Sequence, residues 1–575
     1  MDTIEKPKVA RKLYSFIYSI CLGLAAICAV AAGSPRTAVA ARAIVIDQGP
    51  LKGISTPGEN QYLGIPYAAA PVGNLRWRPP QPPAHFKALF HATQFSNVCT
   101  QLQLGAGPLV GSEDCLYLNV YVPDTDPPAH GFPVMVWIHG GGLTWGAGSQ
   151  YDPTPLVEKG DVIVVTINYR LGYLGFFAHP ALDTEGHLAG NYGLLDQQFA
   201  LKWVRRNIGA FGGDRNRVTI FGESAGGLSV YSQLASPTAA GLFQRAIAES
   251  GAYASFGGHF PFTDYFASDI VSLAIGESTG TPNGVSCSVP SGNDAATSVG
   301  CPSPATASCL RAVSAATLVL AESCDVNPFV DGTVLRQPPG EALGSGQFNH
   351  VPVISGSNHD ENRFSVALAE LASGSPLTAA GYPQAVYSFF GLPGPPPDNG
   401  FADSVISLYP LSADPTSPSI ELGALGDASF VCPARNADLS LSPYVPTYAY
   451  EFHDETAPPF FPPLSFPLGD AHFIEVQYLF DLKAFFGISP TFTPDQQALS
   501  NTMIGYWTQF AKTGNPNGPK EGENQQEGAE EEGVPLWPSY SETAQFLSLV
   551  APAPVAESDT SFDTDHKCSG FWNKL

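Results

Sequence analysis

Residues 218–230, VTIFGESAGGLSV, constrain the fold of this chain more than any other stretch. The apolar run 218–221 predicts a strand, and the GESAG turn after it predicts a sharp passage into a helix. Gly222 and Gly226 suit this turn because side chains there would clash. Ser224 is then exposed above the sheet edge at a helix N-terminus. There it can attack a carbonyl carbon if a base accepts its proton.

A second copy of this five-residue pattern, GESTG at 276–280, is centred on Ser278. It follows a helix-like apolar stretch and not a β-branched strand. It then runs into TPNG, which favours a turn over a helix. We therefore expect Ser278 to be a loop serine and Ser224 to be the nucleophile.

Apolar runs alternate with helical spacing along much of the chain. The runs 133–138 and 162–167 are almost wholly apolar, which is typical of strands buried on both faces. Further elements are expected as a helix at 193–208 and strands at 115–122, 351–355 and 445–452. This alternation predicts an α/β fold with a mainly parallel sheet and right-handed crossovers.

The length of 575 residues suits several small domains or one large α/β domain with insertions. Residues 255–345 are rich in Gly, Ser, Pro, Ala and Cys, and 363–445 are rich in helix and loop patterns, so both are interpreted as excursions from the sheet. Residues 517–533 form an acidic, low-complexity insert that we expect to be disordered.

Acidic residues outnumber basic ones by 52 to 27, giving a formal net charge of −25. A chain this acidic is a poor binder of nucleic acid, and we interpret the charge as a source of solubility.

At the N-terminus, a basic segment precedes an uncharged stretch, 13–33, and an A-x-A cleavage signal, 38–40. Residues 1–40 are thus predicted to be a signal peptide. An uncleaved membrane anchor is the alternative, because the apolar run could span a bilayer.

Eight of the ten cysteines lie beyond this segment, an even number that fits disulfides in an oxidising compartment. No C-x-x-C motif occurs, so the cysteines give no support for zinc or thioredoxin-like chemistry. We predict an exported protein, secreted or periplasmic.

A serine nucleophile needs a base, a group that orients the base, and donors for the oxyanion. HGGG at 139–142 directly follows the apolar run 133–138, and its glycines let backbone N–H groups approach a substrate oxygen. The expected partner of this loop is the N–H of Ala225, the residue after the nucleophile.

The base should be a histidine downstream of Ser224. His472 lies between a Pro/Gly-rich loop and an apolar helical pattern, and His453 and His566 remain alternatives. The orienting acid should follow a strand between the serine and the histidine, where Asp360 and Glu361 are both candidates. The order Ser…Asp/Glu…His is that of α/β-hydrolases.

These residues together resemble the type-B carboxylesterases, the esterase and lipase group that includes the cholinesterases. The resemblance runs from about residue 53 to 575. It rests on YLGIPYAAAPVGNLRWRPPQP, SEDCLYLNVYVP, WIHGGG, the long segment NYGLLDQQFALKWVRRNIGAFGGDRNRVTIFGESAGG, FVDGTVL, GSNHDEN, the segment around His472, YWTQFAKTGNPNG and PLWPSY. It implies an α/β-hydrolase fold with a large, mostly parallel sheet, flanking helices and inserted cap or gorge segments. Residues 41–575 would form this single domain.

The resemblance also implies a role for each site residue. It selects Glu361 over Asp360 as the acid and places the base at His472. The oxyanion donors fall on Gly141, Gly142 and Ala225, and Glu223 and Ser250 match positions that tune the triad. The implied disulfides are Cys99–Cys115, Cys301–Cys309 and Cys432–Cys568, which leaves Cys287 and Cys324 to pair with each other.

The sequence departs from the family pattern at several positions. Asn362 stands where the family prefers glycine, and an asparagine tolerates a positive φ better than most residues. Leu143, near Trp145, and Phe473 replace the residues usual after the glycine loop and after the histidine, and could reshape the acyl pocket. No tryptophan lies between Cys99 and Cys115, so cation–π recognition of choline there is unsupported.

The resemblance therefore implies a serine carboxylesterase that acts on small uncharged esters through an acyl-enzyme, without cofactor or metal. A lipase acting on longer acyl chains is the alternative enzyme. A non-catalytic adhesion protein is the alternative outside enzymes. It is disfavoured because serine, glutamate, histidine and the glycine loop are all retained.

Overall fold

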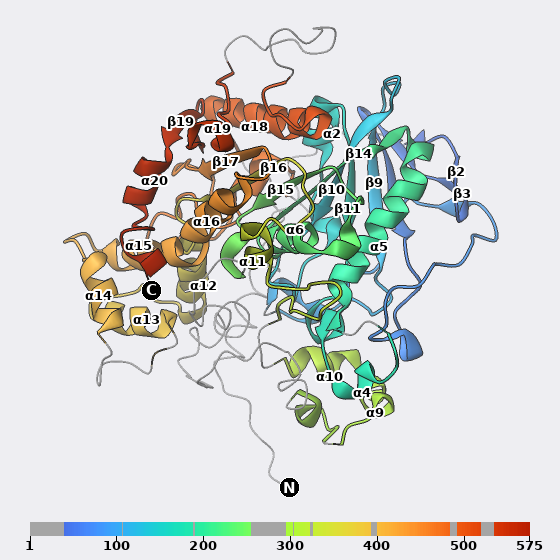
Figure 1. Cartoon of the computed structure of the whole chain (residues 1–575), viewed down its shortest axis with the longest axis horizontal. Coiled ribbons are helices and arrows are strands. Elements are labelled where there is room, and N and C mark those ends of the chain that lie inside the picture. Colours follow the sequence, from blue (N-terminus) through green and yellow to red (C-terminus); the bar gives the residue numbers. More distant parts are fainter. Residues whose placement is uncertain are drawn as a thin grey trace, which may run out of the picture.

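The computed structural model describes residues 39–105, 107–187, 190–254, 295–302, 304–322, 326–390, 392, 400–482, 491–518 and 534–574. Within them, twelve strands form one sheet that runs through the middle of the molecule, with helices on both sides (Figure 1). In spatial order the strands are β1 (Val39–Ala40), β4 (Ile54–Thr56), β5 (Glu59–Pro66), β9 (Tyr117–Pro123), β11 (Ile163–Ile167), β10 (Phe132–Ile138), β14 (Gly213–Glu223), β15 (Arg245–Glu249), β16 (Val353–Asn358), β17 (Thr447–Phe452), β18 (Gln545–Leu549) and β19 (Val555–Ser558).

The strands from β11 to β18 are all parallel to one another. Antiparallel strands flank them, with β9, β5, β4 and β1 at one edge and β19 at the other. The predicted α/β class with a mainly parallel sheet is thus confirmed. Three smaller sheets contain β2 (Ile44–Ile46), β3 (Gly49–Lys52) and β6 (Phe90–His91); β7 (Gln101–Leu102) and β8 (Leu109–Val110); and β12 (Phe176–Phe177) and β13 (Gly190–Asn191).

Helices connect the strands and cover the sheet. The longer ones are α5 (Tyr192–Asn207), α6 (Ala225–Ala235), α12 (Arg363–Ser373), α16 (Cys432–Leu441) and α18 (Pro494–Thr513). The shorter ones are α2 (Thr154–Gly160), α3 (Gly172–Gly175), α4 (Pro180–Asp183), α9 (Ala307–Ala312), α10 (Ala315–Leu320), α11 (Pro339–Gly344), α13 (Tyr382–Phe389), α14 (Phe401–Leu408), α15 (Ser417–Gly423), α19 (Tyr540–Thr543) and α20 (Asp559–Asp565). None of the described helices is both long and apolar enough to cross a membrane.

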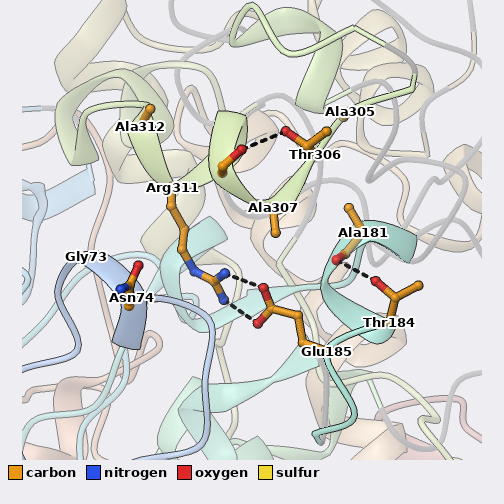
Figure 2. Close-up of a pocket in the computed structure, with 11 residues that line it drawn as sticks. Gly73, Asn74, Ala181, Thr184, Glu185, Ala305, Thr306, Ala307, Arg311 and Ala312 are labelled. Carbon is orange, nitrogen blue, oxygen red and sulfur yellow. Dashed lines mark hydrogen bonds and ion pairs between the residues drawn. The ribbon is translucent and has the colours of Figure 1, made fainter.

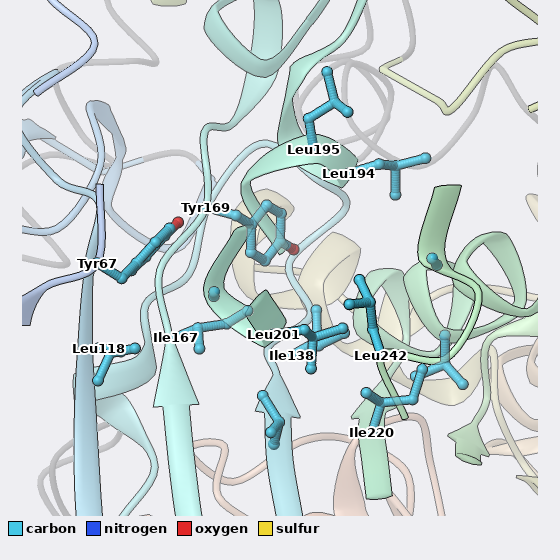
Figure 3. Packing of buried hydrophobic residues seen from close by; sticks show 14 of the residues in the cluster. Tyr67, Leu118, Ile138, Ile167, Tyr169, Leu194, Leu195, Leu201, Ile220 and Leu242 are labelled. Carbon is cyan, nitrogen blue, oxygen red and sulfur yellow. The ribbon is translucent and has the colours of Figure 1, made fainter. Parts of the chain in front are cut away.

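Alternation along β10 divides the core between the two faces of the sheet. Val136 and Ile138 join the cluster formed with α5 and α6, whereas Met135 and Trp137 join the cluster formed with α18. Figure 3 shows the first of these clusters, in which leucines of α5 pack over the ends of the central strands. Because both faces are covered, β10 is wholly buried, as its continuous apolar sequence predicts.

Three disulfides join the pairs that the resemblance implies: Cys99–Cys115, Cys301–Cys309 and Cys432–Cys568. Cys287 and Cys324 lie outside the described residues, as do Ser278, the N-terminal segment up to residue 38, and the acidic insert from residue 519 to 533.

Candidate active site

Ser224 lies between the last residue of β14 and the first residue of α6. Its backbone has φ 56° and ψ −122°, a conformation that costs of order 1–3 kcal/mol for a residue other than glycine. The tight approach of neighbouring backbone explains the two glycines. A Cβ on Gly222 would lie 2.5 Å from the carbonyl oxygen of Ile138, and a Cβ on Gly226 would collide with that same oxygen. The sequence 222–226 therefore builds the strained turn predicted for a nucleophile.

The glycine loop after β10 packs directly on this turn. A Cβ on Gly140 would lie 2.8 Å from the carbonyl oxygen of Glu223 and 3.1 Å from the Cβ of Ser224. Gly141 and Gly142 have φ values of 99° and 60°, and Leu143 continues the left-handed backbone with φ 58°. The loop thus brings backbone close to Ser224 in a conformation that glycine adopts readily.

His139, at the start of this loop, is a buried structural residue. Its ring stacks on Tyr169 at 4.5 Å between centroids, and the Tyr169 hydroxyl donates to the carbonyl oxygen of His139 at 2.8 Å. Burial lowers the pKa of His139 to about 4, against the opposing contact of Nδ1 with the Gly140 carbonyl. The neutral ring therefore supports the loop and carries no charge near neutral pH.

The structure brings His472 and Glu361 together across 111 residues. Nδ1 of His472 lies 2.5 Å from Oε2 of Glu361, and both side chains are buried. The other carboxylate oxygen accepts a hydrogen bond from the backbone N–H of Asn358 at 2.9 Å. Glu361 is thus held from two sides and can orient the imidazole with Nδ1 as the donor.

The other candidates for the acid and the base have other contacts. Asp360 binds Arg363, with 2.5 Å between Oδ2 and Nη1. His566 is held by Asp427 and by Glu451, each at 2.6 Å. The ring of His453 stacks on His359. In the geometry, Glu361 and His472 are the acid–histidine pair near Ser224.

The turn after Glu361 differs in one detail from the expectation. Asn362 has φ −80° and ψ −5°, so no left-handed conformation occurs there and a positive φ does not explain the asparagine. Its amide instead donates to the carbonyl oxygen of Leu422 at 3.0 Å. The side chain has a tethering role that a glycine could not supply.

The second nitrogen of His472 faces the turn that holds the serine. Nε2 lies 3.1 Å from Oε1 of Glu223, the residue before Ser224. Burial opposes the charged imidazolium, but the carboxylates of Glu223 and Glu361 outweigh it and raise the pKa of His472 to about 9. Burial also raises the pKa of Glu223 well above its ordinary value, although the charge of His472 opposes this.

Two further buried glutamates, which the sequence analysis did not identify, complete a group of four with Glu223 and Glu361. Burial raises the pKa of Glu249 to about 8, and its Oε1 accepts from the indole N–H of Trp507 at 3.0 Å. Burial raises the pKa of Glu475 to about 7, helped by Glu361, and its Oε2 accepts from the Asn358 amide at 2.6 Å. Two sequence features could have identified these glutamates: Glu475 follows His472 by three residues, and Glu249 directly precedes Ser250.

Aromatic rings line the site around the serine and the histidine. The ring of Phe430 lies 4.7 Å from that of His472 and 5.1 Å from that of Tyr253. Burial raises the pKa of Tyr253, and its neutral hydroxyl is hydrogen-bonded to Ser224. No sequence motif pointed to Tyr253, although it follows Ser250 by only three residues.

The predicted supporting and pocket residues are also located. Ser250 is buried with φ 48°, and its hydroxyl has no hydrogen-bond partner among the described residues. Leu143 is buried, and the indole of Trp145 lies against Gly141. The ring of Phe473 packs on Phe460 at 5.8 Å between centroids, within the core cluster of α18.

A surface hollow of about 810 Å³ lies at η1 (Gly73–Leu75), α4 and α9, apart from these residues. Figure 2 shows its charged centre, where Arg311 and Glu185 form a two-pronged ion pair. None of the predicted site residues lines it. Its only charged groups satisfy each other, so the chemistry of the protein is expected at Ser224.

A strained serine turn on a parallel sheet, a facing glycine loop and an acid–histidine pair define the α/β-hydrolase class. The profile of the Carboxylesterase family matches residues 40–259 and 267–565, and the chain belongs to that family. It is accordingly a carboxylic ester hydrolase. The family and the enzyme class predicted from the sequence are confirmed.

Named relatives agree with this assignment. Pyrethroid hydrolase Ces2e of Rattus norvegicus is 34% identical over 515 residues, covering 86% of this chain and 82% of that protein. The para-nitrobenzyl esterase of Bacillus subtilis (strain 168) is 33% identical over 547 residues, covering 91% and 98%. Among solved structures, a thermophilic PNB esterase matches with a TM-score of 0.67 and 32% identity, covering 92% of this chain and 99% of that one.

Proposed function

We propose that the protein is an exported serine carboxylesterase that hydrolyses uncharged esters through an acyl-enzyme on Ser224. His472 is the general base and acid, and Glu361 orients it. The oxyanion donors are the backbone N–H groups of Gly141, Gly142 and Ala225. The observation that carries the proposal is the 2.5 Å contact of His472 with Glu361, in a histidine whose other nitrogen faces the residue before the strained Ser224.

In the acylation step, Ser224 Oγ attacks the ester carbonyl carbon while Nε2 of His472 accepts the hydroxyl proton. This step needs the neutral imidazole, which becomes the main form of His472 only above its pKa of about 9. The carbonyl oxygen becomes an oxyanion that the three N–H groups stabilise, at about 3 kcal/mol for one donor. Glu361 stabilises the imidazolium. When the intermediate collapses, the carbon–oxygen bond to the alcohol breaks and His472 returns the proton to that alcohol.

In the deacylation step, a water molecule replaces the alcohol. His472 takes a proton from the water as its oxygen attacks the acyl carbon, and the same oxyanion site is used again. Collapse breaks the bond to Ser224, which recovers its proton from His472 and releases the carboxylic acid. Glu223 and Ser250 are assigned positioning roles, because they adjoin the imidazole and the turn and do not contact the reacting carbon.

Uncharged esters are proposed as substrates because aromatic rings line the site and the tryptophan that would bind a cation is missing. Phe430 and Tyr253 supply apolar contact beside the nucleophile. No tryptophan lies between Cys99 and Cys115 to bind a quaternary ammonium group. Relatives of the chain are named para-nitrobenzyl esterase and pyrethroid hydrolase, and the first of these names is that of an ester-cleaving enzyme.

The deciding experiment compares hydrolysis of p-nitrophenyl esters, from acetate to palmitate, by the wild type and by Ser224→Ala. Ser232→Ala is the matched control, because its buried hydroxyl bonds only the carbonyl oxygen of Leu228 inside α6. We expect a maximum at short chains and a loss of at least about 10⁴-fold in kcat for Ser224→Ala alone. Activity that persists in Ser224→Ala would refute the proposed nucleophile.

Other outcomes of the same series separate the alternatives. A maximum at long acyl chains, lost in Ser224→Ala, would identify a lipase. A folded wild type that hydrolyses nothing and is not labelled at Ser224 by an organophosphate would indicate a binding protein. An initial burst of p-nitrophenol in stopped-flow measurements would demonstrate the acyl-enzyme.

Export is proposed from the N-terminal segment 1–40 and from the disulfides, which suit an oxidising compartment. Val39 and Ala40 pair with Ser55 and Ile54 as β1, so cleavage after Ala40 would remove the outermost strand. N-terminal sequencing of the protein from the culture medium or periplasm decides this. A mature chain that starts at Ala41 would fit the proposal, and a membrane-bound chain that keeps residue 1 would establish the anchor instead.

A further inference from the structure

Two histidines, His359 and His453, meet at the ends of neighbouring strands. β16 and β17 are parallel, with Asn358 opposite Phe452 in register, and each strand is followed directly by a histidine. The rings of His359 and His453 therefore stack, with centroids 4.2 Å apart and planes at 11°. The ester hydrolysis proposed above uses neither of them.

The ring nitrogens of this pair are held loosely. His359 reaches Asp360 and Asp565 at 3.4 Å each, and His453 reaches Glu455 at 3.6 Å and Glu451 at 3.9 Å. Histidine–carboxylate hydrogen bonds are normally about 2.7–2.9 Å long. His566, which is next to His359, is different, because Asp427 and Glu451 occupy both of its nitrogens at 2.6 Å. It has no lone pair to offer.

Asp470 is the third group, and it is buried without a donor. Neither carboxyl oxygen of Asp470 has a hydrogen-bond donor among the described residues, and its side chain is wholly inaccessible to solvent. Its polar neighbour is another acid, Asp360, and burial together with this acid raises the pKa of Asp470 well above its ordinary value. A buried carboxyl group whose nearest polar partner is a second carboxyl group calls for a cation or a shared proton.

One atom each of His359, His453 and Asp470 come together within 4.8 Å of one another. Two imidazole nitrogens and one carboxylate oxygen are a ligand set that zinc prefers, whereas calcium and magnesium prefer oxygen alone. In a tetrahedral zinc site such atoms are about 3.3 Å apart. The two histidine side chains are 22% and 32% exposed, so they can tilt out of their stack to close that gap.

We propose that His359, His453 and Asp470 bind one Zn²⁺ ion, with water from the exposed side as the fourth ligand. Asp360 stays paired with Arg363 and adds negative charge beside the ion. The bound ion would link the ends of β16 and β17 to the segment before His472. The site is separate from the ester chemistry, which needs no metal.

The test uses the complete mature protein without an affinity tag. A chelator first removes any bound metal, and the protein is then returned to metal-free buffer. Zinc chloride is titrated by calorimetry, and bound zinc is counted after dialysis. We expect about one ion per chain, with affinity reduced at least about tenfold in His453→Gln and in Asp470→Asn. His350→Gln is the control, because this exposed histidine contacts Gly346 on another part of the surface. It should bind zinc like the wild type.

Folding and thiol binding are controlled separately. Asp470→Asn keeps the shape and removes the contact between two acids, so its melting temperature without zinc should equal or exceed that of the wild type, and zinc should no longer raise it. Cobalt replacing zinc should give tetrahedral ligand-field bands without a thiolate charge-transfer band. Absence of zinc binding, or equal binding in both variants and the wild type, would overturn the proposal and leave a proton shared between Asp360 and Asp470.

Discussion

Two residues at this site adopt a conformation or a degree of burial that is unusual for their residue type. Ser224 adopts a backbone conformation suited to glycine, and Glu361 is an acid with no exposed surface. Neighbouring structure stabilises both residues in these states. The elements β14 and α6 fix the backbone of the serine, and hydrogen bonds from Asn358 and His472 hold the carboxylate of Glu361. The substitution of one such residue should therefore affect chemistry more than folding.

Glu361→Gln tests the orienting role of the acid. A glutamine keeps the size of the side chain but favours the wrong imidazole tautomer, so we expect kcat on a soluble ester to fall by about 10³–10⁴-fold with little change in KM. Far-UV circular dichroism should be unchanged. Glu370→Gln, at a half-buried carboxylate that bonds only Ser465, is the control. A fall of less than tenfold in Glu361→Gln would assign the acid to another residue.

Glu59 gives a prediction about stability and pH. Burial raises the pKa of Glu59 to about 7, although Gln61 and Thr154 donate to its Oε1 and oppose the shift, and nearby Asp152 adds to it. The folded state thus holds a proton that the unfolded state, with a pKa of 4.5, releases. The contribution of Glu59 to the free energy of unfolding is complete below about pH 4.5. It is lost as the pH rises to about 7, which lowers the free energy of unfolding by roughly 3 kcal/mol.

Glu59→Gln should remove this cost, because its amide stays neutral and its oxygen still accepts both bonds. The variant should melt at a higher temperature than the wild type at pH 8 and at a similar temperature at pH 4.5. Calorimetry at both values measures the difference, with the exposed Glu341→Gln as a control. A pH-independent difference would show that Glu59 is charged throughout.

At the scale of elements, the site is a junction of three strand ends. β10 leads into the glycine loop, β14 into the serine turn and β16 into Glu361, and all three are parallel strands whose carboxyl ends meet at one edge. Ligands in open α/β sheets bind at this edge. The spacing between the loop and the turn is set by backbone contact at Gly140 and Gly226.

Gly226→Ala tests that contact. Its methyl group would collide with the carbonyl of Ile138, which belongs to β10, so either the sheet or the loop must move. We expect a loss of at least about 2 kcal/mol of unfolding free energy and a large fall in kcat. Gly505→Ala is the control, since a methyl group there meets nothing within 4 Å in exposed helix, and should stabilise by about 0.5–1 kcal/mol. Equal melting temperatures for the two variants would contradict the contact.

The elements were easier to predict than the contacts between them. The central strands and α5 follow from continuous apolar runs and helical spacing, and β14 extends farther, from Gly213, because its start pairs with Phe132 across an irregular register. The residues alone left His472, His453 and His566 open as the base, because which histidine faces Glu361 depends on packing between segments 111 residues apart. The buried Glu249 contacts Trp507 across 258 residues, and its place directly before Ser250 was the one local signal for it.

At the scale of the whole molecule, Cys432–Cys568 joins α16 to the C-terminal segment across 136 residues. The loop that it closes contains β17, His472, α18 and β18. Closing a long loop removes more freedom from the unfolded chain than closing a short one. This bridge is therefore expected to contribute more to stability than Cys301–Cys309, which spans eight residues.

Replacing both Cys432 and Cys568 by serine should lower the free energy of unfolding by about 2–5 kcal/mol. The same change at Cys301 and Cys309 should lower the free energy of unfolding by about 2.5 kcal/mol less, because closing the shorter loop removes less entropy from the unfolded chain. Denaturant titration under non-reducing conditions compares the two double variants with the wild type. A larger loss from the short bridge would mean that native packing around each bridge dominates over loop length.

The buried glutamates near His472 also affect how the reaction ends. Hydrolysis turns a neutral ester into an acid that ionises, and this anion forms within a few side chains of Glu223 and Glu361, in a chain that carries a net charge of −25. Burial raises the pKa of Glu223 well above its ordinary value and those of Glu249 and Glu475 to about 8 and about 7, so near neutral pH these groups are largely protonated. They become charged, and repel the product anion, as the pH rises. Repulsion of the acid product is therefore expected to strengthen at alkaline pH, where product inhibition by a carboxylate should be weaker than near neutral pH.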